Sequence, residues 1–143
     1  MFKKAVRDHL VGDAAITVEL EAFDFSTGMP EPGIFTSRMI PETTGRPVIW
    51  IQDTGSDRDF GTRGHRGGDQ FLDILVLGNR IRTDKGLEAL AILVWKRMHR
   101  ANLRGILEGF CPAMCVASPP VEVSDADGFY AWSISLQIRF DEP

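Results

Sequence analysis

The chain has 143 residues, of which 43% are apolar and 25% charged, and this composition predicts one globular domain with a substantial core. Its formal net charge of −4 argues against general affinity for nucleic acid, although local basic patches stay possible. No run approaches the roughly 18–20 apolar residues of a membrane span, and the N-terminal residues lack the apolar stretch of a secretory signal peptide. We therefore expect a single domain over residues 1–143, made and kept in a cytoplasm and outside any membrane.

The N-terminal segment Phe2–Val11 predicts a short helix that ends near Gly12. The side chains that share one face at helical spacing are Phe2, Val6, His9 and Leu10. A histidine on such a face, without cysteine or carboxylate ligands at metal-binding spacing, indicates a structural role.

Two interpretations of Asp13–Phe23 remain open. Asp13 can cap a helix because its carboxylate can accept from first-turn amides, and the spacing of Ile16, Leu20 and Phe23 favours that helix. The alternation of Ile-Thr-Val instead favours a strand from Ile16 to Leu20.

The next segments predict a loop followed by strands. Asp24–Gly33 contains two prolines and two glycines, which predicts a loop without regular structure. Ile34–Ile40 predicts a strand that ends before a proline. Pro47–Gln52 and Phe71–Leu77 are strongly apolar and predict buried strands, the first opened by a proline that a strand start tolerates.

A glycine-rich and charged segment, Gly55–Asp69, separates those two apolar runs. So much glycine and charge cannot pack as a core, and unstructured loops longer than about 12–15 residues inside a compact domain are usually functional or disordered. The sequence therefore predicts a long flexible hairpin loop that orders on a partner.

Several known loop chemistries do not fit this segment. It has no G-x-x-x-x-G-K-[ST] pattern and leads into a strand, so no helix N-terminus awaits a phosphate. The aspartates near His65 match no calcium-loop spacing. Its arginines are balanced by aspartates, which weakens a DNA-binding role. We expect docking on acidic protein partners through five side chains: Arg58, Phe60, Arg63, His65 and Arg66.

Thr83–Asn102 predicts the longest helix, capped by Thr83 or Asp84. Its apolar stripe at helical spacing consists of Leu87, Leu90, Ala91, Val94 and Met98. Ile92, Leu93 and Trp95 lie outside that stripe and are candidates for a subunit interface.

The C-terminal third predicts a return to strands. Ala113–Val116 and Val121–Ser124 are short candidates, and Asp125–Gly128 is a turn. Tyr130–Phe140 alternates apolar and polar residues throughout, so one face of that strand should be buried and the other wet or in contact with a partner. The fold class is therefore α+β, with a mostly antiparallel, mixed sheet packed against two helical elements and with the long hairpin loop.

The sequence indicates no catalytic, cofactor or metal site. Cys111 and Cys115 lack a second ligand pair for zinc, and in a strand they would lie roughly 13 Å apart, beyond disulfide reach. They should be reduced cysteines in or near the core. Asp73 interrupts an apolar strand, where a carboxylate usually faces the wetter side or pairs across the sheet. No serine lies in a nucleophile-elbow context.

The order of these blocks resembles the tail-terminator, or tail-completion, family of tailed bacteriophages, which is also found in prophages and gene transfer agents. The resemblance covers nearly the whole chain and depends on hydrophobic blocks and turns rather than on one specific motif. The blocks that carry it are Leu10–Ala15 after a short helix, Arg38–Pro41, Arg46–Trp50, the polar loop with His65, Phe71–Asn79, Leu87–Ala91, and the turn Asp125–Gly128 before a long strand.

Membership in that family would imply a structural virion protein without enzymatic activity or cofactor. Such proteins form a ring, typically of six copies, on the head-proximal end of the tail tube, where the ring stops tube growth and receives the head-completion proteins. DNA would pass through the lumen without specific binding, which a mildly acidic surface permits. The protein would reside in the tail or neck of the virion after assembly in the host cytoplasm.

Two alternatives stay open. Another neck component, such as a head-closure or adaptor protein, would share the size, acidity and ring habit. A small α+β ligand-binding or enzyme domain would need a pocket with convergent polar groups, and the sequence shows none.

Overall fold

The computed structural model describes residues 2–20, 22–24, 28–36, 47–62, 65–79, 84–103, 113–124 and 129–142. Within these ranges the side chains at 24, 56–62, 65–67, 79, 84–85, 113, 124, 129–130 and 141–142 are not described.

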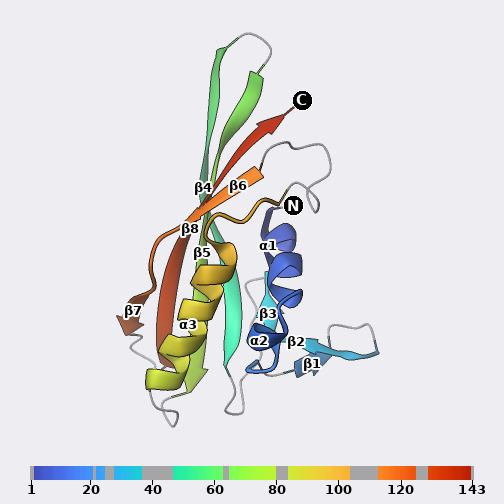
Figure 1. The fold of residues 1–143 in the computed structure, drawn as a ribbon, viewed down its shortest axis with the longest axis vertical. Coiled ribbons are helices and arrows are strands. Elements are labelled where there is room, and N and C mark those ends of the chain that lie inside the picture. The colour runs from blue at the N-terminus through green and yellow to red at the C-terminus, as the bar shows by residue number, and fades with distance from the viewer. Residues whose placement is uncertain are drawn as a thin grey trace.

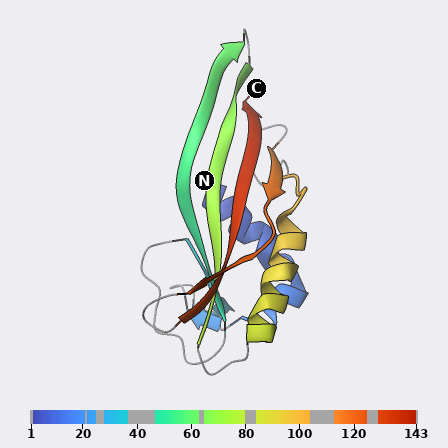
Figure 2. The same ribbon diagram turned by 90° about the vertical axis from the view of Figure 1, so that its left-hand side faces the viewer.

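A helix layer lies against one face of a long, twisted sheet (Figures 1 and 2). The helices are α1 (Phe2–Val11), α2 (Ala14–Thr17) and α3 (Asp84–Met98). The strands are β1 (Ala22–Asp24), β2 (Pro30–Pro32), β3 (Ile34–Phe35), β4 (Val48–Thr62), β5 (His65–Asn79), β6 (Ala113–Ala117), β7 (Val121–Ser124) and β8 (Phe129–Glu142).

The main sheet has the strand order β3-β4-β5-β8-β6, and β7 also pairs with β8. Only the short β3–β4 pairing is parallel among the pairings described, and the others are antiparallel. The predicted α+β class with a mostly antiparallel, mixed sheet is therefore confirmed.

The core forms where α1 and α3 meet the central strands β5 and β8. The predicted apolar stripe of α3 is buried along its whole length, from Leu87 to Met98. Register places Leu72 opposite Leu136 and Ile74 opposite Ile134, so these buried pairs form one face of the sheet. The alternation of Tyr130–Phe140 predicted this face because side chains on a strand point to opposite sides in turn.

The contact between α1 and α3 is held by a reciprocal pair of hydrogen bonds. The Arg97 Nε donates to the His9 carbonyl at 3.1 Å, and the His9 Nε2 lies 3.2 Å from the Arg97 carbonyl oxygen, to which it can donate. Burial, followed by the charge of Arg97, lowers the pKa of His9. The predicted structural role of His9 is therefore the fastening of these two helices.

Two side chains, Trp95 of α3 and His99 just after that helix, close the outer edge of β6. The Trp95 Nε1 donates to the Ala117 carbonyl at 3.0 Å, and the His99 Nδ1 accepts from the Ala117 amide at 3.2 Å. Two residues earlier, the backbone of Cys115 bonds to Arg100 and Ala101. This edge is thus satisfied within the chain, and Cys115 is a buried free thiol whose pKa burial raises to about 12. Cys111 lies outside the described residues.

Of the two interpretations of Asp13–Phe23, the helix is partly right and the strand from Ile16 to Leu20 is wrong. Asp13 caps the single-turn α2 by accepting from the Ala15 amide at 3.0 Å, and the strand β1 begins only at Ala22. The predicted loop Asp24–Gly33 is wrong at both ends, because Asp24 belongs to β1 and Pro30–Pro32 pairs with that strand. Proline is tolerated there because this strand lies at the edge of a two-stranded sheet.

The predicted helix Thr83–Asn102 is too long at its C-terminal end. Helix α3 ends at Met98, and Arg100 adopts a positive φ of 64°. The chain turns there so that its backbone can pair with β6. The cap residue Thr83 and the end of the predicted strand Ile34–Ile40 lie outside the described residues; β3 itself covers Ile34–Phe35.

The prediction of a flexible loop at Gly55–Asp69 is wrong for most of its length. Strand β4 continues to Thr62, β5 begins at His65, and the two strands pair with each other. Gly67 and Gly68 also pair with β8, so the ladder has a third strand here. Hydrogen bonds between backbones can hold glycine and charged residues in strands without an apolar core.

Glycine is needed at position 78 for close packing of α3 on β5. A Cβ there would lie 3.0 Å from the Leu87 Cδ1. Because overpacking costs about 1–3 kcal/mol and an alanine in a strand gains about 0.5–1 kcal/mol, we expect Gly78→Ala to lower the free energy of unfolding by about 1 kcal/mol.

The matched control is Gly86→Ala in α3, where nothing lies within 4 Å of the added Cβ. That variant should raise the free energy of unfolding by up to about 1 kcal/mol, since alanine favours helix. Urea unfolding measures both, and equal effects of the two substitutions would contradict the packing at Gly78.

The lowered pKa of His9 predicts a pH dependence. The folded chain takes up a proton on His9 less readily than the unfolded chain, whose histidine pKa is about 6.5. The stabilisation is therefore present above about pH 6.5 and is lost as the pH falls below it. In His9→Gln, which keeps an N–H donor, the loss of stability between about pH 7 and about pH 5.5 should shrink. An unchanged loss in urea unfolding would contradict the assignment.

Candidate assembly surfaces

The arm of the molecule, Gly55–Thr62 of β4 with His65–Asp69 of β5, extends beyond the helix layer (Figure 1). Strand β8 runs beside the β5 side of the arm, from Arg139 opposite Asp69 at the root to Glu142 opposite Arg66. The arm is therefore a continuation of the sheet, so its direction is set by the body rather than by a free loop.

A β-bulge marks the point where the arm leaves the body. Asp53 pairs with Leu72 and Gly55 with Phe71, so Thr54 is the extra residue on β4. Gly55 has a φ of +148°, which residues with a side chain rarely adopt.

The side chain of Gln70 fastens this bulge. Its Nε2 donates to the Asp53 carboxylate and, at 2.9 Å, to the Gly55 carbonyl. Gln70 is the only buried polar or charged side chain among the described residues. These hydrogen bonds give the irregular backbone of the bulge a partner and hold it in place. The arm therefore leaves the body at one defined angle.

Four of the predicted docking residues belong to strands of the arm. Arg58 pairs with Gly68 and His65 with Thr62 through the backbone, Arg66 pairs with Glu142, and Phe60 lies within β4. Their side chains, and the whole of Arg63, lie outside what the structure describes. Their role in partner binding remains a prediction.

Among the described residues, one arginine–carboxylate pair within the chain involves the arm. The Arg139 Nε lies 3.1 Å from the Asp69 Oδ1 across the β5–β8 ladder. Because Arg139 neutralises Asp69, this carboxylate offsets less of the positive charge of the arm's arginines than the sequence suggested.

The open face is the side of the main sheet that the helices leave uncovered (Figure 2). Register places five exposed large apolar residues of this face on β5, β6 and β7. They are Phe71 (37% exposed), Met114 (38%), Val116 (54%), Val121 (62%) and Val123 (42%). Exposed apolar groups gathered on one face indicate an interaction surface.

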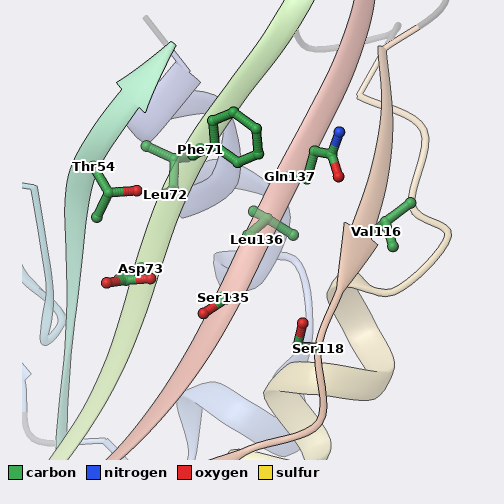
Figure 3. Close-up of a pocket in the computed structure, with 9 residues that line it drawn as sticks. All are labelled: Thr54, Phe71, Leu72, Asp73, Val116, Ser118, Ser135, Leu136 and Gln137. Atoms are coloured by element: carbon green, nitrogen blue, oxygen red, sulfur yellow. The ribbon is translucent and has the colours of Figure 1, made fainter. Parts of the chain in front are cut away.

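A hollow of about 400 Å³ lies on the open face (Figure 3). Its lining comes from Thr54, Phe71, Leu72, Asp73, Val116, Ser118, Ser135, Leu136 and Gln137. Asp73 is the sole ionisable group in that lining, so the hollow brings together no acid–base or nucleophile–base pair.

The three predicted interface residues on α3 differ in their surroundings. Leu93 is 37% exposed and Ile92 is half-buried. Trp95 packs against the core and stacks on His99, with ring centroids 5.9 Å apart. Trp95 therefore has a role within the chain, and the interface role of all three remains a prediction.

The sequence analysis missed the apolar residues of β6 and β7 as a surface. The signal was present in Met114-Cys115-Val116-Ala117, where four consecutive apolar residues occupy a strand too short for a helix. Such a run indicates that both faces of a strand meet apolar surroundings.

No helix within the described ranges is long and apolar enough to cross a membrane. Likewise, among the residues whose placement is given, no three His, Cys, Asp or Glu side chains gather as metal ligands would.

No family model matches the sequence, and no curated protein matches it. A solved chain from the virion of a native gene transfer agent particle has a similar structure, with a TM-score of 0.66. The match covers 97% of this chain and 93% of that one at 13% sequence identity. The two chains therefore share a fold over nearly their whole length.

The fastening of the bulge can be tested with Gln70→Leu. Removing the amide leaves the Gly55 carbonyl without its side-chain donor, so we expect the free energy of unfolding to fall by about 1–3 kcal/mol. Amides of the arm should also exchange faster with deuterium than those of β8.

The matched control is Gln137→Leu on the neighbouring strand, whose side chain makes no hydrogen bond with the described part of the chain. It should change the free energy of unfolding by less than about 0.5 kcal/mol. Equal stability losses in the two variants would refute the role of Gln70.

Proposed function

We propose that this chain is a structural virion protein, and that within the virion it acts as a ring-forming tail terminator. The ring would cap the head-proximal end of the tail tube, stop tube polymerisation and present the docking surface for the head-completion proteins. The observation that carries the proposal is the fold shared over 97% of the chain with a chain of a gene transfer agent virion. The block order of the sequence supports the finer role.

The uncovered surfaces support an assembly role over a catalytic one. A ring needs two different contact surfaces on each subunit, because its interface is repeated by rotation. The open face and the outer side of α3 are two such surfaces, on opposite layers of the molecule. The arm is a third projecting element, long enough to reach beyond the body toward a partner.

The size and charge of the chain suit a conduit for DNA. Each phosphate that a basic side chain neutralises strengthens the binding of DNA. A lumen built from chains with a formal net charge of −4 would bind DNA weakly and let it slide. Arg58, Phe60, Arg63, His65 and Arg66 on the arm are proposed to dock on acidic surfaces of the tube protein or of a neighbouring subunit. DNA would pass without specific contact.

A head-closure or adaptor protein is the alternative within the virion. The two roles differ in the partner that they recognise, which is the tail tube for a terminator and the portal side of the neck for an adaptor. Mass measurement of the purified chain, alone and with tail tube protein, separates them. A terminator should form a ring, typically of six copies, and should bind tubes; a chain that binds no tube would refute the terminator role.

The arm provides a sharper test. We expect replacement of Asp59–Gly67 by an Asn-Gly turn to leave the fold intact, because the bulge, the Asp69–Arg139 pair and the core remain. Tail tubes polymerised with this variant should be longer and more variable than with the unaltered chain. Loss of folding would show that the arm stabilises the body.

A variant with two charge reversals on the arm separates the recognition of a partner from the effect of arm length. Arg58→Glu with Arg66→Glu should also impair capping, whereas Lys4→Glu on the exposed side of α1 should not. The lengths of tail tubes in electron micrographs measure capping by the shortened arm, by the double charge reversal and by Lys4→Glu. Normal capping by the arm variants would remove the arm from the proposed function.

A further inference from the structure

The open face combines apolar groups with an acidic one that lacks a partner. Phe71 and Val116 line the hollow from either side, with Asp73 also in its lining (Figure 3). Asp73 is half-buried, and its carboxylate makes no hydrogen bond or ion pair with any described residue. The rest of the lining is apolar or uncharged, so this half-buried carboxylate can pair with a cation that a partner delivers.

The outer stripe of α3, formed by Ala89, Leu93 and Lys96, offers the complementary chemistry. These exposed residues follow at i, i+4 and i+7, so they share one face of the helix. Leu93 is 37% exposed, and Lys96 has no ion-pair partner among the described residues. An apolar group followed one turn later by a cation matches the apolar and acidic hollow.

Two other modes of self-association are disfavoured. The outer edge of β6 is already bonded to α3 and to residues 100–101, so a second copy cannot add a strand there. A contact between two open faces would bring two copies of Asp73 together, and the Arg139 cation of that face already pairs with Asp69. The contact that remains joins two different surfaces of complementary chemistry, the open face of one copy and the helix layer of another.

We propose that the outer stripe of α3 from one copy packs onto the open face of the next copy. Leu93 enters the hollow between Phe71 and Val116, and Lys96 pairs with Asp73. The contact is heterologous, so its repetition gives a ring where the rotation between copies closes. This inference rests on the proposed assembly function and names the surfaces by which the copies meet.

The direct test uses two variants, each blocked on one surface. Val116→Asp introduces a charge on the open face, and Leu93→Glu introduces one on the outer stripe of α3. Each variant alone should be a monomer by native mass spectrometry at concentrations where the unaltered chain forms rings. Val18→Asp, at a residue 68% exposed and outside both surfaces, should form rings normally.

Mixing the two blocked variants gives the decisive result. Val116→Asp keeps its α3 stripe and Leu93→Glu keeps its open face, so one intact contact joins them. The mixture should form a one-to-one dimer and nothing larger. Rings formed by either variant alone, or a mixture that stays monomeric, would overturn the proposal.

A charge exchange tests the ion pair. Asp73→Lys and Lys96→Asp should each weaken association by roughly 10-fold or more, and the double variant should recover most of that loss. Additive losses in the double variant would contradict a direct contact between the two side chains.

The outcomes also separate this inference from the proposed function. If the unaltered chain forms rings on tail tubes and both blocked variants still do so, the inference fails and the proposed function stands. If the variants form rings alone but no longer bind tubes, the open face receives the tube protein, and the inference fails. If the unaltered chain forms no ring and binds no tube, the proposed function itself fails.

Discussion

The β5–β8 ladder is the constraint on which the rest of the structure depends. It pairs the two strands continuously from Arg66 with Glu142 to Asn79 with Phe129. One end of the ladder carries the core pairs that the helices cover, and the other end carries the β5 side of the arm. Because both ends share one register, the position of the arm follows from the packing of the core.

The helix layer buries only one side of that ladder, and this asymmetry explains the surfaces of the molecule. On the covered side the residues alternate Leu72, Ile74 and Val76 into the core. On the other side the same strand presents Phe71 and Asp73 to solvent. Within the described part of the chain no second layer covers this face, and apolar groups exposed together on one face indicate an interaction surface.

The sequence predicted the elements in which local periodicity and burial agree. Helix α1 occupies Phe2–Val11 as expected, and the stripe of α3 and the alternation of β8 identified the core face. These predictions succeed because a helix or strand that buries one face repeats its apolar residues at a fixed period.

The elements that depend on distant partners were missed. Gly67 and Gly68 form strand because β8 pairs with them, and Pro30–Pro32 does so because β1 lies beside it. Neither pairing leaves a local pattern, since the backbone rather than the side chains makes the contact. The role of Trp95 in closing the edge of β6 likewise depends on a partner 22 residues away. The role of the predicted docking side chains on the arm remains a prediction, because those side chains lie outside what the structure describes.

The central claim is that copies of this chain form a ring at one end of a tail tube. Its most direct test is to image assembled tails in the electron microscope with the chain labelled at its N-terminus by a small gold particle. The account predicts label at the head-proximal end alone, with about six particles in a ring when single ends are averaged. Label distributed along the tube, at the distal end, or only in unattached heads would contradict it.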